Sequence, residues 1–122
     1  VRDRRILIVD DDESIGLGMT ETLRDAGYAA GYVTNGTDAM DATKNGAYSL
    51  VFMDMVMLGM SGLETFKRIK GAGADPRVVL FTGFFKDSER TIVEGVREGM
   101  IDLYIRKPFF AEEIIQAARR YA

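Results

Sequence analysis

The sequence predicts an α/β protein of the doubly wound type, in which a five-stranded parallel sheet carries helices on both faces. Short apolar runs of strand length recur five times, and a segment with apolar residues at helical spacing follows each of them. Such strand–helix alternation with short connections gives parallel strands joined by right-handed crossovers. With 122 residues, 47% of them hydrophobic, the chain can bury the core of one domain.

The first two strand–helix units lie in the amino-terminal part of the chain. Residues 5–10 form an apolar run that predicts a strand buried on both faces, and apolar spacing over residues 15–26 predicts the helix after it. Residues 28–34 form a weaker strand pattern, which the turn pair Asn35-Gly36 is expected to close. A short helix is then expected over residues 39–47.

The same alternation continues to the end of the sequence. Short apolar runs predict strands at residues 49–54, 77–82 and 102–106. Apolar residues at helical spacing after each run predict helices at residues 62–70, 87–99 and 110–121. Since no linker, repeat or low-complexity segment interrupts the pattern, residues 1–122 are expected to form a single domain.

Composition excludes several classes of function. The net charge is −3, from 16 basic and 19 acidic residues spread along the chain, so we expect no direct binding of nucleic acid and no attraction to anionic lipid. The longest apolar runs are far shorter than the roughly 20 residues that span a bilayer. The sequence has no cysteine and no histidine, which excludes disulfides, imidazole metal ligands and a catalytic triad. A cytoplasmic location and protein partners are expected.

Chemically complementary side chains stand at the carboxyl ends of four predicted strands. In chain order they are Asp10, Asp11, Asp12, Asp54, Thr82 and Lys107. Carboxyl ends of parallel strands share one edge of the sheet, where doubly wound folds bind their ligands. Carboxylates about 4 Å apart repel each other by on the order of 4 kcal/mol at an effective dielectric of 20, so the cluster needs a cation. Oxygen-only ligands of this kind suit Mg²⁺, with Mn²⁺ as a plausible substitute.

Each of these residues also has an ordinary structural role. Asp12 could cap the first helix and Glu13 could stabilise its positive end, while Asp54 could cap a loop. Thr82 could serve packing or a turn, and Lys107 could simply belong to a loop. The joint pattern, with acid, hydroxyl and lysine on one edge, favours a functional site over these separate roles.

Four segments that carry these residues resemble the response-regulator receiver family of two-component signalling, and the resemblance covers nearly the whole chain. They are residues 6–13 (ILIVDDDE), 50–55 (LVFMDM), 79–83 (VLFTG) and 104–109 (YIRKPF). The resemblance, which is to the chemotaxis-regulator type, implies a flavodoxin-like (βα)5 fold with strand order 2-1-3-4-5. It also implies a phosphorelay receiver, a signalling domain that catalyses only its own phosphorylation and dephosphorylation.

The resemblance assigns a role to each residue of the acidic site. Asp54 would be the phosphoacceptor, taking a phosphoryl group from a sensor histidine kinase or phosphotransfer protein and becoming an acyl phosphate. Asp11, Asp54 and the backbone carbonyl of Val56 would bind Mg²⁺ directly, while Asp10 would act through water. Lys107 would contact the phosphoryl group.

The resemblance also implies a switch. The Thr82 hydroxyl would move to a phosphoryl oxygen and Tyr104 would turn inward, although ordinary core packing is the alternative for Tyr104. The change would bias a surface made by the helix at residues 87–99, the strand at residues 102–106 and the last helix. An output domain or effector protein would bind this surface, and two copies of the chain could dimerise through it.

Two apolar residues suggest a slow loss of phosphate. Val56 and Phe84 stand two residues beyond Asp54 and Thr82, at positions that flank the path of the hydrolytic water in this family. Since neither side chain can orient water, the phosphorylated state is expected to last many minutes or more, unless both only pack against neighbours. Leu58 replaces the proline usual in the family, which predicts an altered loop rather than lost phosphorylation.

Three other functions fit parts of the pattern. Asp10 and Asp12 satisfy the Asp-x-Asp motif of haloacid dehalogenase-type phosphohydrolases, as nucleophile and acid/base, but only Glu112 and Glu113 follow Lys107 as further metal ligands. A pseudo-receiver would keep the fold without being phosphorylated. A flavodoxin-like flavin carrier would share the topology, but the acidic first loop would repel a phosphate.

Overall fold

A parallel sheet of five strands forms the centre of the molecule, in the order β2-β1-β3-β4-β5. The computed structural model describes residues 5–45, 48–55, 57, 59, 61–74, 76–82, 103–106 and 110–122. The strands are β1 (Arg5–Val9), β2 (Ala29–Val33), β3 (Tyr48–Asp54), β4 (Arg77–Thr82) and β5 (Leu103–Arg106). The doubly wound fold and the 2-1-3-4-5 strand order predicted from the sequence are therefore confirmed.

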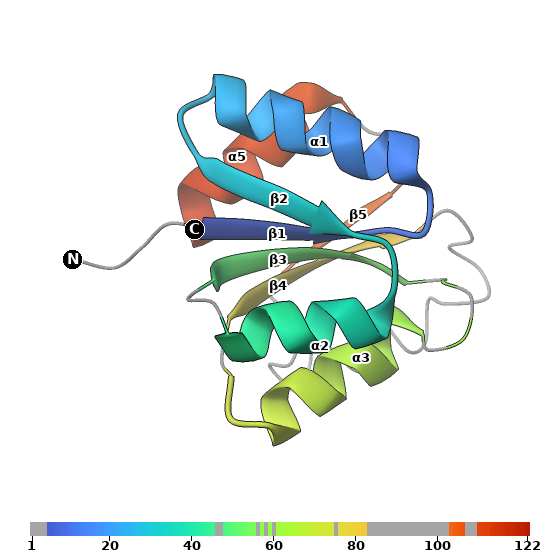
Figure 1. The fold of residues 1–122 in the computed structure, drawn as a ribbon. Coiled ribbons are helices and arrows are strands. Elements are labelled where there is room, and N and C mark those ends of the chain that lie inside the picture. Colours follow the sequence, from blue (N-terminus) through green and yellow to red (C-terminus); the bar gives the residue numbers. More distant parts are fainter. Residues whose placement is uncertain are drawn as a thin grey trace.

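Helices cover both faces of the sheet. They are α1 (Glu13–Asp25), α2 (Gly36–Asn45), α3 (Gly62–Gly71) and α5 (Ala111–Tyr121). Figure 1 shows α1 and α5 together on one face and α2 and α3 on the other. The helix expected at residues 87–99 lies outside the described residues. Among the described helices, none has the length and apolar character needed to cross a membrane.

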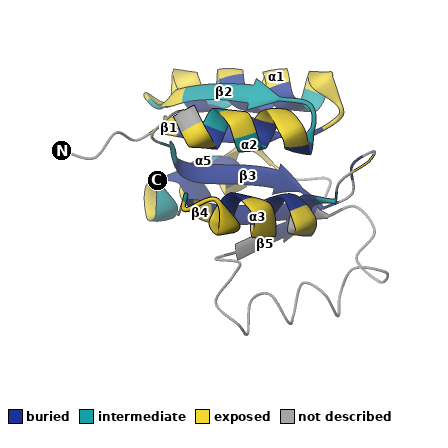
Figure 2. Ribbon diagram, turned by 60° about the horizontal axis from the view of Figure 1, so that its bottom comes forward, coloured by how far each residue is buried: buried dark blue, intermediate teal, exposed yellow. Residues whose placement is uncertain are grey.

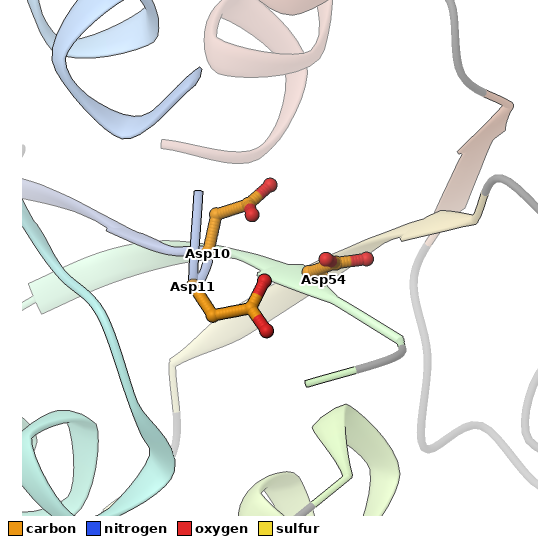
Figure 3. A group of neighbouring side chains, drawn as sticks. All are labelled: Asp10, Asp11 and Asp54. Carbon is orange, nitrogen blue, oxygen red and sulfur yellow. The ribbon is translucent and has the colours of Figure 1, made fainter. Parts of the chain in front are cut away.

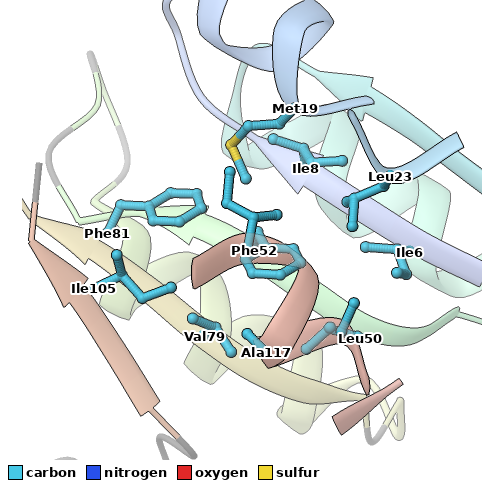
Figure 4. Packing of buried hydrophobic residues seen from close by; sticks show 12 residues of the cluster. Ile6, Ile8, Met19, Leu23, Leu50, Phe52, Val79, Phe81, Ile105 and Ala117 are labelled. Carbon is cyan, nitrogen blue, oxygen red and sulfur yellow. The ribbon is translucent and has the colours of Figure 1, made fainter. Parts of the chain in front are cut away.

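Alternate side chains of the central strands enter two separate cores. Leu7 and Val51 belong to a buried cluster with Phe66 of α3, whereas Ile8 and Phe52 belong to the cluster under α1 and α5. Figure 4 shows this second cluster, in which the rings of Phe52 and Phe81 stack with centroids 5.5 Å apart. Because both faces of β1 and β3 are covered, the inner residues of these strands, 6–9 and 50–53, are all apolar.

Burial decreases from the centre of the sheet to its β2 edge. In Figure 2, β3 is buried along nearly all of its length, whereas β2 is mostly of intermediate exposure. β2 pairs with β1 alone among the described strands. Its weak strand pattern in the sequence, with two alanines and a glycine, agrees with this edge position.

Polar caps begin the first two helices directly after a strand. The Asp12 carboxylate accepts hydrogen bonds from Ser14, at 3.0 Å from the backbone N and 2.6 Å from Oγ, and so caps α1. Asn35 Oδ1 accepts the Asp38 N–H at 2.8 Å at the start of α2. The sequence pattern suggested a turn at Asn35-Gly36 with a helix from about residue 39, but this cap starts α2 at Gly36.

Candidate functional site

Three aspartates converge just beyond the carboxyl ends of two neighbouring strands. Asp10 and Asp11 follow the last residue of β1, and Asp54 is the last residue of β3. Because β1 and β3 pair in parallel, both strand ends reach the same edge of the sheet. One oxygen of each carboxylate lies within 4.8 Å of the other two. Figure 3 shows the three side chains at this edge. The convergence predicted from the strand ends is therefore present.

The backbone on either side of the cluster is fixed by the sheet. The Asp10 backbone N donates to the Val33 carbonyl at 3.2 Å, which ties the end of β1 to β2. The Met55 N donates to the Phe81 carbonyl at 2.8 Å, which ties the residue after Asp54 to β4. The aspartates thus project from backbone that the hydrogen-bonded ladder holds in place.

The three carboxyl groups differ in their access to solvent. Asp10 is fully buried, with 0% of its surface exposed, and its Oδ1 accepts the Asp12 N–H at 2.9 Å. Asp54 keeps 6% of its surface exposed, whereas Asp11 is exposed. The group therefore runs from an inaccessible carboxylate to an open one, with Asp54 between these extremes.

The spacing of the carboxylates fits a shared divalent cation. Two unit charges 4.8 Å apart repel by about 3.5 kcal/mol at an effective dielectric of 20, and solvent screens the part that involves exposed Asp11. Two oxygens bound to one octahedral ion at about 2.0–2.1 Å lie about 3–4 Å apart. The Asp10, Asp11 and Asp54 oxygens therefore form an acidic group of the kind that binds a divalent metal.

The next two acidic residues take part in the start of α1. Asp12 caps this helix and is not a member of the metal-compatible group found among the described residues. Glu13 lies in the first turn, and its Oε1 accepts a hydrogen bond from the Tyr32 hydroxyl at 3.1 Å. That hydrogen bond raises the pKa of Tyr32 above its ordinary value of 10.0, with smaller contributions from desolvation and the Glu13 charge. The capping role considered for Asp12 is thus confirmed, and Glu13 lies in the first turn, the position that its considered role requires.

The remaining predicted site residues are only partly described. Thr82 is the last residue of β4, in register with Arg106 of β5, so its backbone reaches the same edge of the sheet. Tyr104 lies in β5 opposite Leu80. The side chains of Thr82 and Tyr104 lie outside the described part, as do Val56, Phe84 and Lys107 entirely. Their roles stay predictions.

Comparison with known protein families identifies the family to which this chain and its acidic group belong. Residues 6–119 match the family model of the response regulator receiver domain. The chain belongs to the receiver family. It is a CheY-like receiver domain of two-component signalling, and as such a signalling phosphoacceptor domain rather than an enzyme acting on a separate substrate. The family resemblance stated from the sequence is confirmed.

Individual relatives agree with this assignment. The chain is 38% identical to the uncharacterized transcriptional regulatory protein YkoG of Bacillus subtilis over 93% of its own length and 49% of that protein. It is 31% identical to sporulation initiation phosphotransferase F of the same organism, over 98% of the chain and 94% of the relative. The receiver domain of NtrX from Brucella abortus superposes with a TM-score of 0.83 at 31% identity, covering 94% of this chain and 95% of that one.

Coverage separates these relatives into two kinds. The chain spans about half the length of YkoG and of the DltR and PcoR regulators, but nearly all of the sporulation phosphotransferase. Receiver domains work with histidine kinases and phosphotransferases as partners. Membership in the receiver family sets aside the dehalogenase-type hydrolase and the flavin carrier as readings of this sequence.

One residue beside the site was not found from the sequence. Gly62, the first residue of α3, donates its backbone N–H to the Met55 carbonyl at 3.1 Å, one residue beyond Asp54. The sequence signal was a glycine directly after Ser61, the N-cap of α3. It could not be interpreted before the position of α3 against β3 was known.

Proposed function

We propose that this receiver domain accepts a phosphoryl group on Asp54 from a sensor histidine kinase or phosphotransfer protein, in a Mg²⁺-dependent reaction. The observation that carries the proposal is the convergence of three carboxylates within 4.8 Å at the carboxyl edge of the sheet. The chain covers 94% of a sporulation phosphotransferase to which it is 31% identical, which supports a phosphorelay role.

Differences in access single out Asp54 among the three aspartates. A phosphoacceptor oxygen must be reachable by a phosphorus atom and yet be held in one orientation. Asp10 is fully buried and accepts the Asp12 N–H, so it cannot meet a donor. Asp11 is exposed to solvent. Asp54 ends a buried central strand while keeping part of its surface open.

In the proposed reaction, a carboxylate oxygen of Asp54 attacks the phosphorus of a phosphohistidine or small phosphodonor. The new O–P bond forms as the bond from phosphorus to the histidine nitrogen breaks, which leaves an acyl phosphate on Asp54. The other ring nitrogen of the phosphohistidine carries a proton, so the donor leaves as a neutral imidazole. Asp11, Asp54 and the Val56 carbonyl would hold Mg²⁺, or Mn²⁺ in its place, with Asp10 acting through water. The bound ion would supply positive charge that offsets the charge of the transferring group.

Four further residues complete the proposed switch. Lys107 would contact the phosphoryl group as a second positive charge, and the Thr82 hydroxyl would hydrogen-bond one of its oxygens once Asp54 is modified. Tyr104 would follow Thr82 by turning inward. Val56 and Phe84 would leave the hydrolytic water poorly oriented, so that the acyl phosphate persists for many minutes or more without a phosphatase.

The proposal extends to the surroundings of the domain. We take residues 1–122 as one receiver domain in the cytoplasm, without nucleic-acid or membrane contacts of its own. Because several relatives named as transcriptional regulators are about twice as long, an output domain or separate effector would receive the signal. It would bind the surface formed by residues 87–99, β5 and α5, through which two copies of the chain could also dimerise.

Phosphorylation by acetyl phosphate tests the central claim. The parent protein, Asp54→Asn and the exposed control Asp41→Asn are incubated with acetyl phosphate and Mg²⁺, and intact masses are measured. We expect one added phosphoryl group on the parent and on Asp41→Asn, none on Asp54→Asn, and none in any sample with a chelator. If Asp54→Asn were phosphorylated to the same extent as the parent, the phosphoacceptor would be a residue other than Asp54. An unlabelled parent that also fails to bind beryllofluoride with Mg²⁺ would make the chain a pseudo-receiver.

A further inference from the structure

The first turn of α3 packs directly against the backbone of Asp54. A Cβ placed on Gly62 would overlap the Asp54 carbonyl oxygen, and it would lie 3.0 Å from the Asp54 carbonyl carbon and 3.1 Å from the Met55 Cα. Ordinary contacts between carbon atoms are about 3.5–4.0 Å. Residue 62 therefore fits against the end of β3 only because it has no side chain.

The Asp54 backbone is held from its other side as well. Asp54 pairs with Phe81 in the ladder between β3 and β4, and the Met55 N donates to the Phe81 carbonyl at 2.8 Å. Phe81 itself is fully buried. The peptide that follows Asp54 is thus confined between β4 and Gly62, and it cannot retreat from an added atom without disturbing the sheet.

The start of α3 is fixed in the same way. The Ser61 hydroxyl accepts the Glu64 N–H at 3.1 Å, and the Ser61 carbonyl accepts both the backbone N of Thr65 at 2.9 Å and its Oγ1 at 2.8 Å. Thr65 is fully buried. A side chain at Gly62 would consequently press against the Asp54 backbone while both the start of α3 and the end of β3 are held in place.

Glycine is needed at this position for space and not for backbone conformation. Among the described glycines, positive φ angles occur at Gly27, Gly59 and Gly73, and the φ angle of Gly62 is not positive. Gly71, at the other end of α3, has nothing within 4 Å of the place where a Cβ would stand. One end of α3 therefore has a glycine with no room for a Cβ and the other end has a glycine with room for one, so alanine substitutions at the two positions form a matched pair.

We propose that Gly62 is a positioning residue for Asp54. Its missing side chain allows α3 to set the end of β3, and with it the position of Asp54. An alanine at position 62 would separate α3 from β3 by about 1 Å or more and move Asp54 relative to Asp10 and Asp11. The inference rests on the proposed function, because it assumes that this group binds Mg²⁺ and that Asp54 is phosphorylated.

Displacements of this size matter for a reactive site. Catalytic and metal-binding groups must be held to within about 0.5 Å of their working geometry, and a misplacement of about 1 Å can lower a rate on the order of 100-fold. For Gly62→Ala we therefore expect a Mg²⁺ affinity weaker by about tenfold and phosphorylation by acetyl phosphate slower by about 10- to 100-fold. The folded structure should persist, with a lower Tm.

The experiment compares four proteins, all as the full chain: the parent, Gly62→Ala, Gly71→Ala and Ser61→Ala. Titration calorimetry with MgCl₂ alone gives the metal Kd, backbone NMR shifts report the surroundings of Asp10 and Asp54, and mass spectrometry follows phosphorylation. Gly71→Ala controls for the added methyl group. Ser61→Ala removes the cap of α3 and lowers Tm without placing an atom against Asp54, so it controls for lost stability.

The outcomes separate the inference from the proposed function. A Kd and phosphorylation rate within about twofold of the parent for Gly62→Ala, or equal losses in Ser61→Ala, would overturn the positioning role. If Gly62→Ala does not fold, the double variant Gly62→Ala/Gly71→Ala is measured in its place. If the double variant does not fold either, the positioning role is overturned, since Gly62 would then be required for folding of the whole domain. A parent that binds Mg²⁺ but is never phosphorylated refutes the proposed function, while the Kd comparison still tests Gly62.

Discussion

Neutralising the buried carboxylate of Asp10 should stabilise the protein when no metal is present. In Asp10→Asn the side chain keeps its shape and keeps an oxygen that can accept the Asp12 N–H, now 2.9 Å from Oδ1. It loses the charge that lies within 4.8 Å of the Asp54 and Asp11 oxygens. The substitution therefore isolates the electrostatic contribution of one member of the acidic group.

The expected gain follows from the geometry. Repulsion between two charges 4.8 Å apart is about 3.5 kcal/mol at an effective dielectric of 20. Against this stands the weaker hydrogen bond from the Asp12 N–H to a neutral acceptor, a loss of about 1 kcal/mol, together with lost attraction to positive groups. We expect Asp10→Asn to be more stable by about 1–2 kcal/mol, which raises Tm by about 4–8 °C in a domain of this size.

Thermal unfolding in chelator and in excess Mg²⁺ tests this account. Metal bound only by the folded state adds about 2.7 kcal/mol at a free concentration 100 times the Kd, and the parent should gain more of it than Asp10→Asn. The order of the two Tm values should thus reverse between the two buffers. The exposed control Asp41→Asn should stay within about 0.5 kcal/mol of the parent in both. A lower Tm for Asp10→Asn in chelator would refute the view that these carboxylates repel one another.

Three further predictions concern the frame of the site. Tyr32 donates a hydrogen bond to Glu13, so the pKa of Tyr32 is raised above 10.0. The hydrogen bond therefore stabilises the fold at lower pH, and this stabilisation is lost as the pH rises through the raised pKa. The difference between the absorbance titrations of the parent and Tyr32→Phe should have its midpoint above 10.0, and Glu13→Gln should lower that midpoint. Asp12→Ala should cost about 1 kcal/mol in urea unfolding through loss of the α1 cap, whereas Asp12→Asn should cost far less, and equal losses would contradict the capping role. Phe52→Ala should cost about 3–5 kcal/mol, while Phe110→Ala, 77% exposed in the parent, should change stability by less than about 0.5 kcal/mol.

Most of the fold could be predicted from the sequence because its strands are buried on both faces. The inner residues of such strands have to be apolar, and the run Val78 to Phe81 indicated a strand at residues 77–82, the limits that β4 has in the structure. The least accurate boundary was the start of α2, where Asn35 was interpreted as part of a turn. The same residue type favours turns and helix caps, and only the hydrogen bond to Asp38 distinguishes the two.

The sequence could predict which aspartates cluster in the candidate site, but not how far each of them is buried. Asp10, Asp11 and Asp54 could be grouped because the carboxyl ends of neighbouring parallel strands share one edge. Their unequal burial depends on the helices and loops that cover this edge, which no local pattern encodes. Asp12, adjacent in sequence, was left out of the group because its carboxylate caps α1.

By itself, then, the sequence determined the order of strands and helices, the receiver family and the edge of the sheet where chemistry is possible. The order of strands and helices follows from periodicity, and the family follows from the resemblance of four short segments to receiver domains. Both depend only on residues within a few positions of one another. Only the tertiary structure decided that Asp10 is fully buried, Asp54 nearly so and Asp11 exposed, and that a Cβ on Gly62 would overlap the Asp54 backbone. Both depend on contacts between β3 and elements elsewhere in the chain, whose separations are fixed by the packing of the two cores.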